Sequence, residues 1–165
     1  MASTVSFDVV SDFDRQELVN AIDQVRREIA TRFDFKGTKA QVDLSDKELV
    51  VVTDSEMRSA AIVDLVASKA VRRGLSLKVF DWGKVEPAGG MTFKQRAALR
   101  QGLPEDIAKK ISKLIRDEFP KAHGQIQGGA VRVSGKSKDE LQAVIARLRE
   151  VGEDYPVALQ FENYR

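Results

Sequence analysis

The sequence predicts an α+β fold made of two consecutive domains, because one order of short strands and amphipathic helices occurs twice. Apolar and polar residues alternate over short segments, which is typical of strands with one buried face. Capping residues precede stretches with 3.6-residue apolar periodicity, which indicates helix starts. One stretch rich in glycine and proline, 85–90, separates the two repeats. We therefore predict domains at 1–85 and 86–165.

The first repeat begins with an alternating strand at 6–10 and a helix whose capping box starts at Asp14. Two strands at 40–44 and 49–53 and a second helix from Ser55 follow. We expect the second helix to end near Gly74 and a closing strand to span 75–80. The residues expected to face the core are Leu18, Ile22, Val25, Ile29, Phe33, Ala61, Leu65 and Val66.

The second repeat has the same order. A strand at 91–99 precedes a helix with Pro104 as its first residue. A hairpin about Gly128 and Gly129, a helix with a capping box from Ser137, and a strand at 157–161 complete it. A βαββαβ order is the ferredoxin-like arrangement, in which both helices lie on one face of an antiparallel sheet. The helix residues expected in this core are Ile107, Ile111, Leu114 or Ile115, Phe119, Leu141, Val144, Ile145 and Leu148.

The composition indicates a globular protein of a reducing compartment. The 165 residues include 42% hydrophobic and 32% charged residues and no cysteine. No apolar run approaches the roughly 20 residues that cross a bilayer, and the N-terminus lacks the basic start and apolar run of a signal peptide. We expect a cytoplasmic protein without a membrane partner.

Alternation along the strands of the second repeat predicts a polar sheet face away from the helices. The net charge is only +2, but 15 basic and 11 acidic residues follow Gly83, against 12 basic and 14 acidic residues up to it. Amides can bind base edges and arginine can bind phosphate, although the face could equally be merely solvated. Ile126, Val131, Val133, Val157, Leu159 and Phe161 are expected to face the helices, and Gln125, Gln127, Arg132, Ser134 and Gln160 the open side.

A phosphate site is also predicted at Gly135 and Lys136, ahead of the helix that Ser137 caps. The segment misses the P-loop pattern, because Ala130 stands where the first glycine is required, so hydrolysis of the Walker type is rejected. The alternative is an ordinary capping turn.

Two more groups are candidate ligand-binding residues. Lys109 and Lys113, with Lys110 and Arg116 near them, form a basic helix face that could also be simply solvated. Arg32, Phe35 and Lys36 end the first helix, where Phe35 could stack on a purine between two cations or fill the core.

Catalysis finds little support in the residues. His123 is the single histidine, no cysteine could partner it, and no carboxylate pair or metal-ligand spacing stands out. We therefore expect no enzyme activity, no metal and no cofactor. The remaining enzymatic alternative is a nucleotide hydrolase with water placed by Asp8 or His123.

Several segments along the whole chain together resemble the YajQ family of bacterial nucleotide-binding proteins. They are SFDVVS at 6–11, RFDFKG at 32–37, EPAGG at 86–90, QIQG at 125–128, VRVSGK at 131–136, DELQAV at 139–144 and the terminus from Phe161 to Arg165.

The resemblance implies two ferredoxin-like domains that exchange strands, so that 5–10 completes the second sheet and 91–99 the first. Asp8, and with it Ser6, would then lie beside Gln125, Gln127 and Arg132. The resemblance also implies binding of a nucleotide or RNA, with cyclic di-GMP as an effector ligand of some family members. We expect the chain to bind a purine nucleotide, and a cyclic dinucleotide as an effector that alters contacts with a protein or DNA partner. The alternative function is non-specific binding of RNA such as tRNA.

Overall fold

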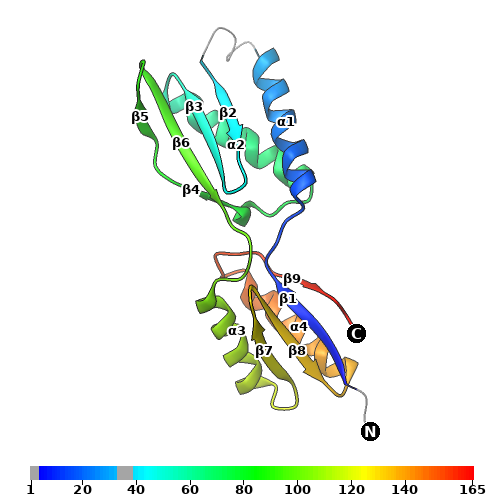
Figure 1. Cartoon of the computed structure of the whole chain (residues 1–165). Helices are drawn as coiled ribbons and strands as arrows, with labels where there is room; N and C mark the ends of the chain where they lie inside the picture. Colours follow the sequence, from blue (N-terminus) through cyan, green and yellow to red (C-terminus); the bar gives the residue numbers. More distant parts are fainter. Residues whose placement is uncertain (1–3, 33–38) are drawn as a thin grey trace. The chain divides into compact units, whose positions relative to one another are not determined.

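The computed structural model describes residues 4–32 and 39–165, which form two compact units (Figure 1). Unit 1 consists of Met1–Asp12 and Gln101–Arg165, and unit 2 of Phe13–Arg100. Each unit has its own hydrophobic core. The fold is α+β with antiparallel sheets, as two tandem ferredoxin-like domains require.

Unit 2 places two helices against one face of a sheet with the order β2-β3-β6-β4, and β5 pairs with β6. All its strand pairs are antiparallel. Its elements are α1 (Arg15–Thr31), β2 (Gln41–Leu44), β3 (Glu48–Thr53), α2 (Glu56–Arg72), the 3₁₀ helix η2 (Leu77–Val79), β4 (Phe80–Trp82), β5 (Glu86–Ala88) and β6 (Thr92–Leu99).

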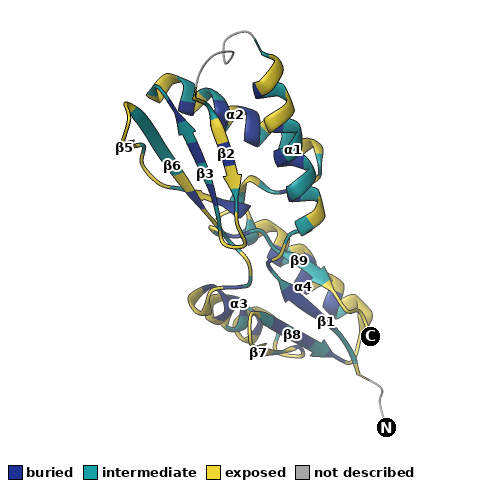
Figure 2. Ribbon diagram, turned by 45° about the horizontal axis from the view of Figure 1, so that its top comes forward, coloured by how far each residue is buried: buried dark blue, intermediate teal, exposed yellow. Residues whose placement is uncertain are grey.

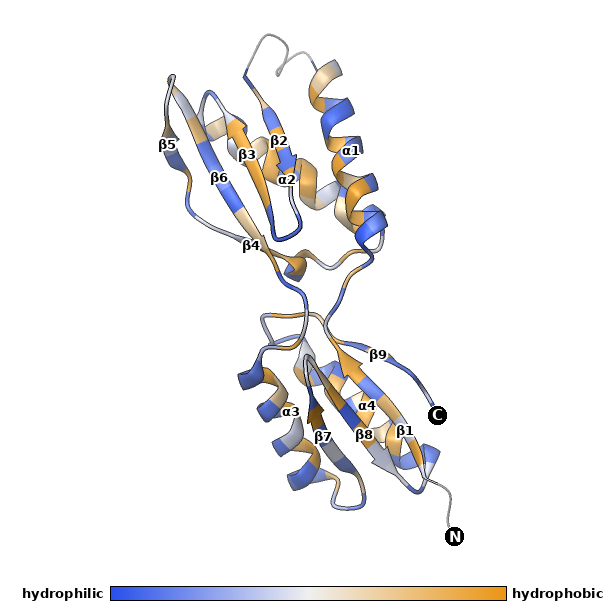
Figure 3. Ribbon diagram, in the orientation of Figure 1, coloured by the Kyte–Doolittle hydropathy of each residue, from blue (hydrophilic) through white to orange (hydrophobic). Residues whose placement is uncertain are grey.

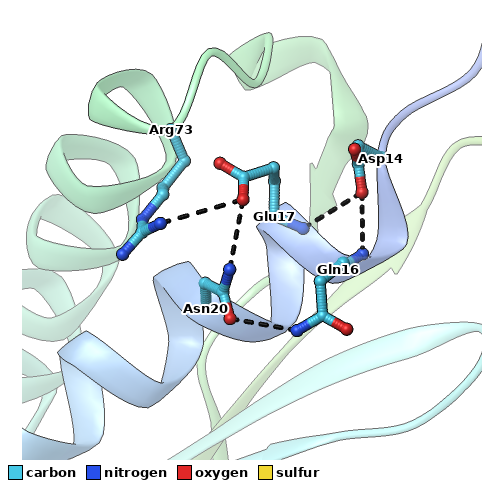
Figure 4. Close-up of polar contacts among 5 residues, drawn as sticks. All are labelled: Asp14, Gln16, Glu17, Asn20 and Arg73. Carbon is cyan, nitrogen blue, oxygen red and sulfur yellow. Dashed lines mark hydrogen bonds and ion pairs between the residues drawn. The ribbon is translucent and has the colours of Figure 1, made fainter.

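The predicted start of α1 is confirmed. The carboxylate of Asp14 accepts hydrogen bonds from the backbone N–H groups of Gln16 and Glu17, at 2.9 and 3.2 Å (Figure 4). These bonds satisfy two of the four N–H groups that a helix start leaves without partners. The Glu17 carboxylate accepts a bond from Asn20 and lies 3.7 Å from the guanidinium of Arg73, which joins α1 to the end of α2 (Figure 4).

Two predictions for unit 2 are wrong in detail. The segment 75–80 is not one strand, because the Ser76 hydroxyl accepts from the N–H of Lys78 and starts η2; only β4 continues as strand. The segment 85–90, which the sequence predicts as the boundary between the repeats, lies inside unit 2, where β5 pairs with β6 across a turn at Gly90 and Met91. Both residues have positive φ angles, 71° and 61°, as tight hairpin turns between twisted strands require.

Unit 1 has the sheet order β7-β8-β1-β9, and β1 is a central strand that pairs antiparallel with β8 and β9. Helices α3 and α4 lie against the same face, and their apolar sides form the core with Phe7 and Val9 of β1. Figure 2 shows the buried residues of β1 and β8 and the mostly exposed edge strand β7. The elements are β1 (Val5–Val10), α3 (Glu105–Glu118), β7 (His123–Gln127), β8 (Ala130–Gly135), α4 (Lys138–Gly152) and β9 (Gln160–Glu162).

Three details of unit 1 differ from the sequence predictions. Pro104 is the N-cap of α3 rather than its first residue, because its backbone is extended. The closing strand is regular only over β9, although Val157 is buried. Ile126 pairs with the core residue Val131 but is 40% exposed, because β7 is the edge of the sheet.

Candidate functional site

The open face of unit 1 is the side of its sheet away from α3 and α4. Phe7, Val131 and Val133 are fully buried on the helix side, so the alternating residues of β1 and β8 lie on the open side. The strand register arranges them in rows. The rows are His123–Ser134–Ser6, Gln125–Arg132–Asp8 and Gln127–Ala130–Val10.

The middle row contains an ion pair. The Arg132 guanidinium donates to the two Asp8 oxygens, with Nε–Oδ1 at 2.9 Å and Nη2–Oδ2 at 3.4 Å. Asn163, just after β9, donates its side-chain amide to Asp8 at 2.8 Å. The hydrogen bonds from Arg132 hold the pKa of Asp8 below its ordinary value, although burial acts in the opposite direction; the hydrogen bond from Asn163 lowers the pKa further. Asp8 therefore stays ionised, and the pair has no net charge.

This neutrality changes the predicted role of Arg132. An anion that approaches Arg132 also meets the field of Asp8, which cancels much of the attraction. Asp8 is itself only 7% exposed, so it is a structural partner of Arg132 and has little surface to offer a ligand or a water. Arg132 can still donate hydrogen bonds from the part of its side chain that remains exposed. It should nevertheless bind phosphate more weakly than the sequence predicts.

The exposed amides of the face lie on the edge strand. Gln125 and Gln127 are both exposed, and each has a donor and an acceptor for a base edge or a ribose hydroxyl. Gln160 is less available, because its side-chain oxygen accepts the N–H of Asp12 at 2.7 Å. Ser134 lies half-buried between His123 and Ser6.

Beyond the end of β8, two lysines flank the start of α4. A cavity of about 560 Å³ is lined by Lys121, Lys136, Ser137 and Glu140. The hydroxyl of Ser137 accepts the N–H groups of Asp139 and Glu140 at 3.2 and 3.4 Å, so it acts as the predicted cap. Anions are stabilised at such a helix start by its positive dipole end, and the two ammonium groups add to that field.

Gly135, a predicted ligand residue, is buried against α4 instead. A Cβ at this position would lie 3.3 Å from Leu141 Cδ2, so the absence of a side chain allows close packing of β8 on the helix. Lys121 is not among the site residues predicted from the sequence. The usable signal was hairpin register, because Lys121 lies two residues before His123 and Lys136 two residues after its partner Ser134.

Lys109 and Lys113 do not join this face, and the remaining predicted site residues belong to unit 2 or lie outside the described residues. Both lysines are exposed on α3, which packs on the opposite face of the sheet, and Lys109 pairs with Glu105 at 3.2 Å. Figure 3 shows hydrophilic residues along the side of α3 that faces away from the sheet. Arg32 belongs to unit 2, where it ends α1 and lies 3.7 Å from Glu28. Phe35 and Lys36 lie outside the described residues.

The described residues contain no group of three or more histidine, aspartate or glutamate side chains arranged to hold a metal ion. No helix in the described part of the chain has the length and apolar character to cross a bilayer.

Comparison with known proteins places these features in a family. The family model described as "Nucleotide-binding protein YajQ-like" matches residues 5–165. The chain belongs to the YajQ-like family. Among its relatives, proteins of Roseiflexus castenholzii and of Nostoc sp. are each 56% identical to it over 165 residues, with the whole of both chains covered. Both relatives are named nucleotide-binding proteins, and the YajQ-like match extends over both units described above.

Proposed function

We propose that the chain binds a purine nucleotide on the open face of unit 1 and catalyses no reaction on it. The observation that carries this proposal is the placement of Lys121 and Lys136 beside the N-terminus of α4, where β8 ends, with the exposed Gln125 and Gln127 on the strand that pairs with β8. The phosphates would bind the two ammonium groups and the helix start, while Gln125 and Gln127 contact the base or ribose. The names of the relatives support a nucleotide as the ligand.

The dimensions of the face favour an extended nucleotide. Arg132, which pairs with Gln125, precedes Lys136 by four positions, and β8 ends one residue before Lys136. At a strand rise of about 3.4 Å per residue, the two positions lie roughly 14 Å apart. A nucleoside triphosphate or a cyclic dinucleotide such as cyclic di-GMP can extend along such a face. An effector role, in which a bound cyclic dinucleotide alters contacts with a protein or DNA partner, is the more specific form of the proposal.

The absence of catalysis follows from the state of the candidate base. Asp8 accepts hydrogen bonds from Arg132 and Asn163, and its lowered pKa makes it a weak acceptor of a proton from water. His123 is exposed on β7 and pairs in register with Ser134 rather than with a carboxylate. We therefore expect the nucleotide to be recovered unchanged after prolonged incubation with the protein.

Removal of the two lysines tests the phosphate site. In Lys121→Ala/Lys136→Ala, the affinity for GTP or cyclic di-GMP is expected to fall by about tenfold or more, because two charge-assisted hydrogen bonds are lost. Isothermal titration calorimetry at constant ionic strength measures the change in Kd.

Two further variants make this test specific. Lys109→Ala/Lys113→Ala removes the same charge from α3, and its Kd should stay within about twofold of that of the unmodified chain. Glu140→Gln removes the acidic group that lines the cavity with the two lysines. The affinity of this variant for the nucleotide should therefore rise by about threefold. Equal losses in both lysine pairs, or no loss at Lys121 and Lys136, would contradict the proposed site.

Non-specific RNA binding is a second candidate, which the exposed basic residues of α3 favour. Lys110, Lys113 and Arg116 are exposed along this helix. RNA bound there would lose affinity steeply with salt and would be weakened by Lys109→Ala/Lys113→Ala. A flat salt response, or an unchanged affinity in that variant, would exclude it.

A further inference from the structure

A second cavity of unit 1 is lined by Lys138, Leu141, Gln142 and Ile145 of α4, whereas Ser137 and Glu140 line the cavity of Lys121 and Lys136, called the lysine cavity below. The second cavity encloses about 310 Å³ between β1, the first turns of α4 and the segment after β9. Its walls include the apolar side chains of Val5, Phe7, Leu141 and Ile145. Two cationic residues, Lys138 and Arg165, also line it.

An aromatic ring stands at this cavity with much of its surface uncovered. Tyr164 lines the cavity and stacks on the buried ring of Phe7, with centroids 6.2 Å apart and planes inclined by 29°. Tyr164 is nevertheless 59% exposed. A tyrosine held in place on one side and open on the other is suited to stack against a flat ligand.

Backbone contacts fix the position of Tyr164. The backbone groups of Arg165 and Ser6 bond each other in both directions, at 3.0 and 2.9 Å. Asn163 has a φ of 56°, a left-handed conformation that asparagine tolerates better than most residues, and its side chain is bonded to Asp8. The segment from Asn163 to Arg165 is thus anchored on β1 at both ends, so the ring does not depend on a ligand for its placement.

From this combination we propose that the cavity binds a small planar aromatic molecule that carries an anionic group. The ring would stack on Tyr164 over the apolar wall, and the anion would bind Lys138 and Arg165 beside the first turn of α4. The volume is at the low end of the range for small-molecule sites, which suits one ring system and is small for a cyclic dinucleotide. A nucleoside monophosphate and an aromatic carboxylate share this chemistry. The site is separate from the lysine cavity of the proposed function and uses different residues.

Titration of the full chain with guanosine 5′-monophosphate, guanosine and indole-3-acetate tests the proposal. Saturable binding of at least one of the two anions is expected, and neutral guanosine should bind more weakly. Tyr164→Ala should weaken the bound anion about tenfold, because stacking is lost, whereas Tyr164→Phe should bind within about twofold of the unmodified chain. Lys138→Ala should weaken binding of the anion and leave binding of guanosine unchanged. If only one of the two anions binds, the result shows whether the cavity selects a nucleoside monophosphate or an aromatic carboxylate.

Lys121→Ala/Lys136→Ala separates this site from the proposed nucleotide face. The Tyr164-dependent binding should persist in that variant, and NMR shifts should occur at the amides of Ser6, Gln142 and Tyr164. If neither anion binds, or if binding is unchanged in Tyr164→Ala, the cavity is not a site for this ligand class. A different result would overturn this inference and support the proposed function: the anion no longer binds to Lys121→Ala/Lys136→Ala but still binds to Tyr164→Ala.

Discussion

Phe7→Ala is expected to lower the free energy of unfolding of unit 1 by about 3–5 kcal/mol, the usual cost of removing a buried aromatic ring. Phe7 has no exposed surface, and its ring packs against Phe161 at 6.0 Å and Tyr164 at 6.2 Å between centroids. It lies on β1, opposite Val133 in the register with β8. The substitution therefore leaves a cavity in the middle of the sheet that carries both proposed sites.

Amide hydrogen exchange, followed by NMR, shows which unit is affected. Slowly exchanging amides of β8 and α4 should lose protection in Phe7→Ala, whereas those of β3 and α2 should keep it. Ile62→Ala is the matched control, because Ile62 is fully buried in the core of unit 2 and should give the opposite pattern. Loss of protection confined to β3 and α2 in Phe7→Ala would contradict the assignment of β1 to unit 1.

Much of the fold could be predicted because its signals are local. The side chains of Asp14 and Ser137 cap α1 and α4, as their positions before periodic apolar residues indicate. The segments 75–80 and 85–90 were harder, because their sequences suit more than one structure. Ser76 uses its hydroxyl to start a 3₁₀ turn. The glycines that suggest a boundary between the repeats lie in the turn of the β5–β6 hairpin.

Strand parity predicted which residues of β7 and β8 lie on the open face, but parity says nothing about their partners. Gln125 and Gln127 are exposed there, and Arg132 is on the same side. The neutralisation of Arg132 depends on which strand pairs with β8, and β1 is 124 residues away in the chain. The shared cavity of Lys121 and Lys136 was also hard to predict, because it depends on where the two strands of the hairpin begin and end.

Asp8→Asn is expected to destabilise unit 1 by about 1.5–3 kcal/mol near neutral pH, the typical contribution of hydrogen bonds to a charged group. The amide has nearly the same shape as the carboxylate, but it cannot accept from Arg132 and Asn163 with the same strength. The substitution also leaves the Arg132 charge uncompensated on the open face. Nucleotide affinity should therefore rise in this variant while stability falls, a combination that a purely structural role of the open face would not produce.

The pH dependence of stability distinguishes the charge of Asp8 from its shape. Because the folded protein holds the pKa of Asp8 below its ordinary value of 3.8, this carboxylate contributes its full stabilisation above that pH. The contribution is lost as the pH falls from 3.8 through the lower pKa of the folded state, since the unfolded chain binds the proton first. Urea unfolding at a series of pH values should thus show a difference in unfolding free energy between the unmodified chain and Asp8→Asn. This difference should be constant near neutrality and shrink below pH 3.8. A difference that stays constant into the acid range would mean that packing, and not the ion pair with Arg132, is what Asp8 contributes.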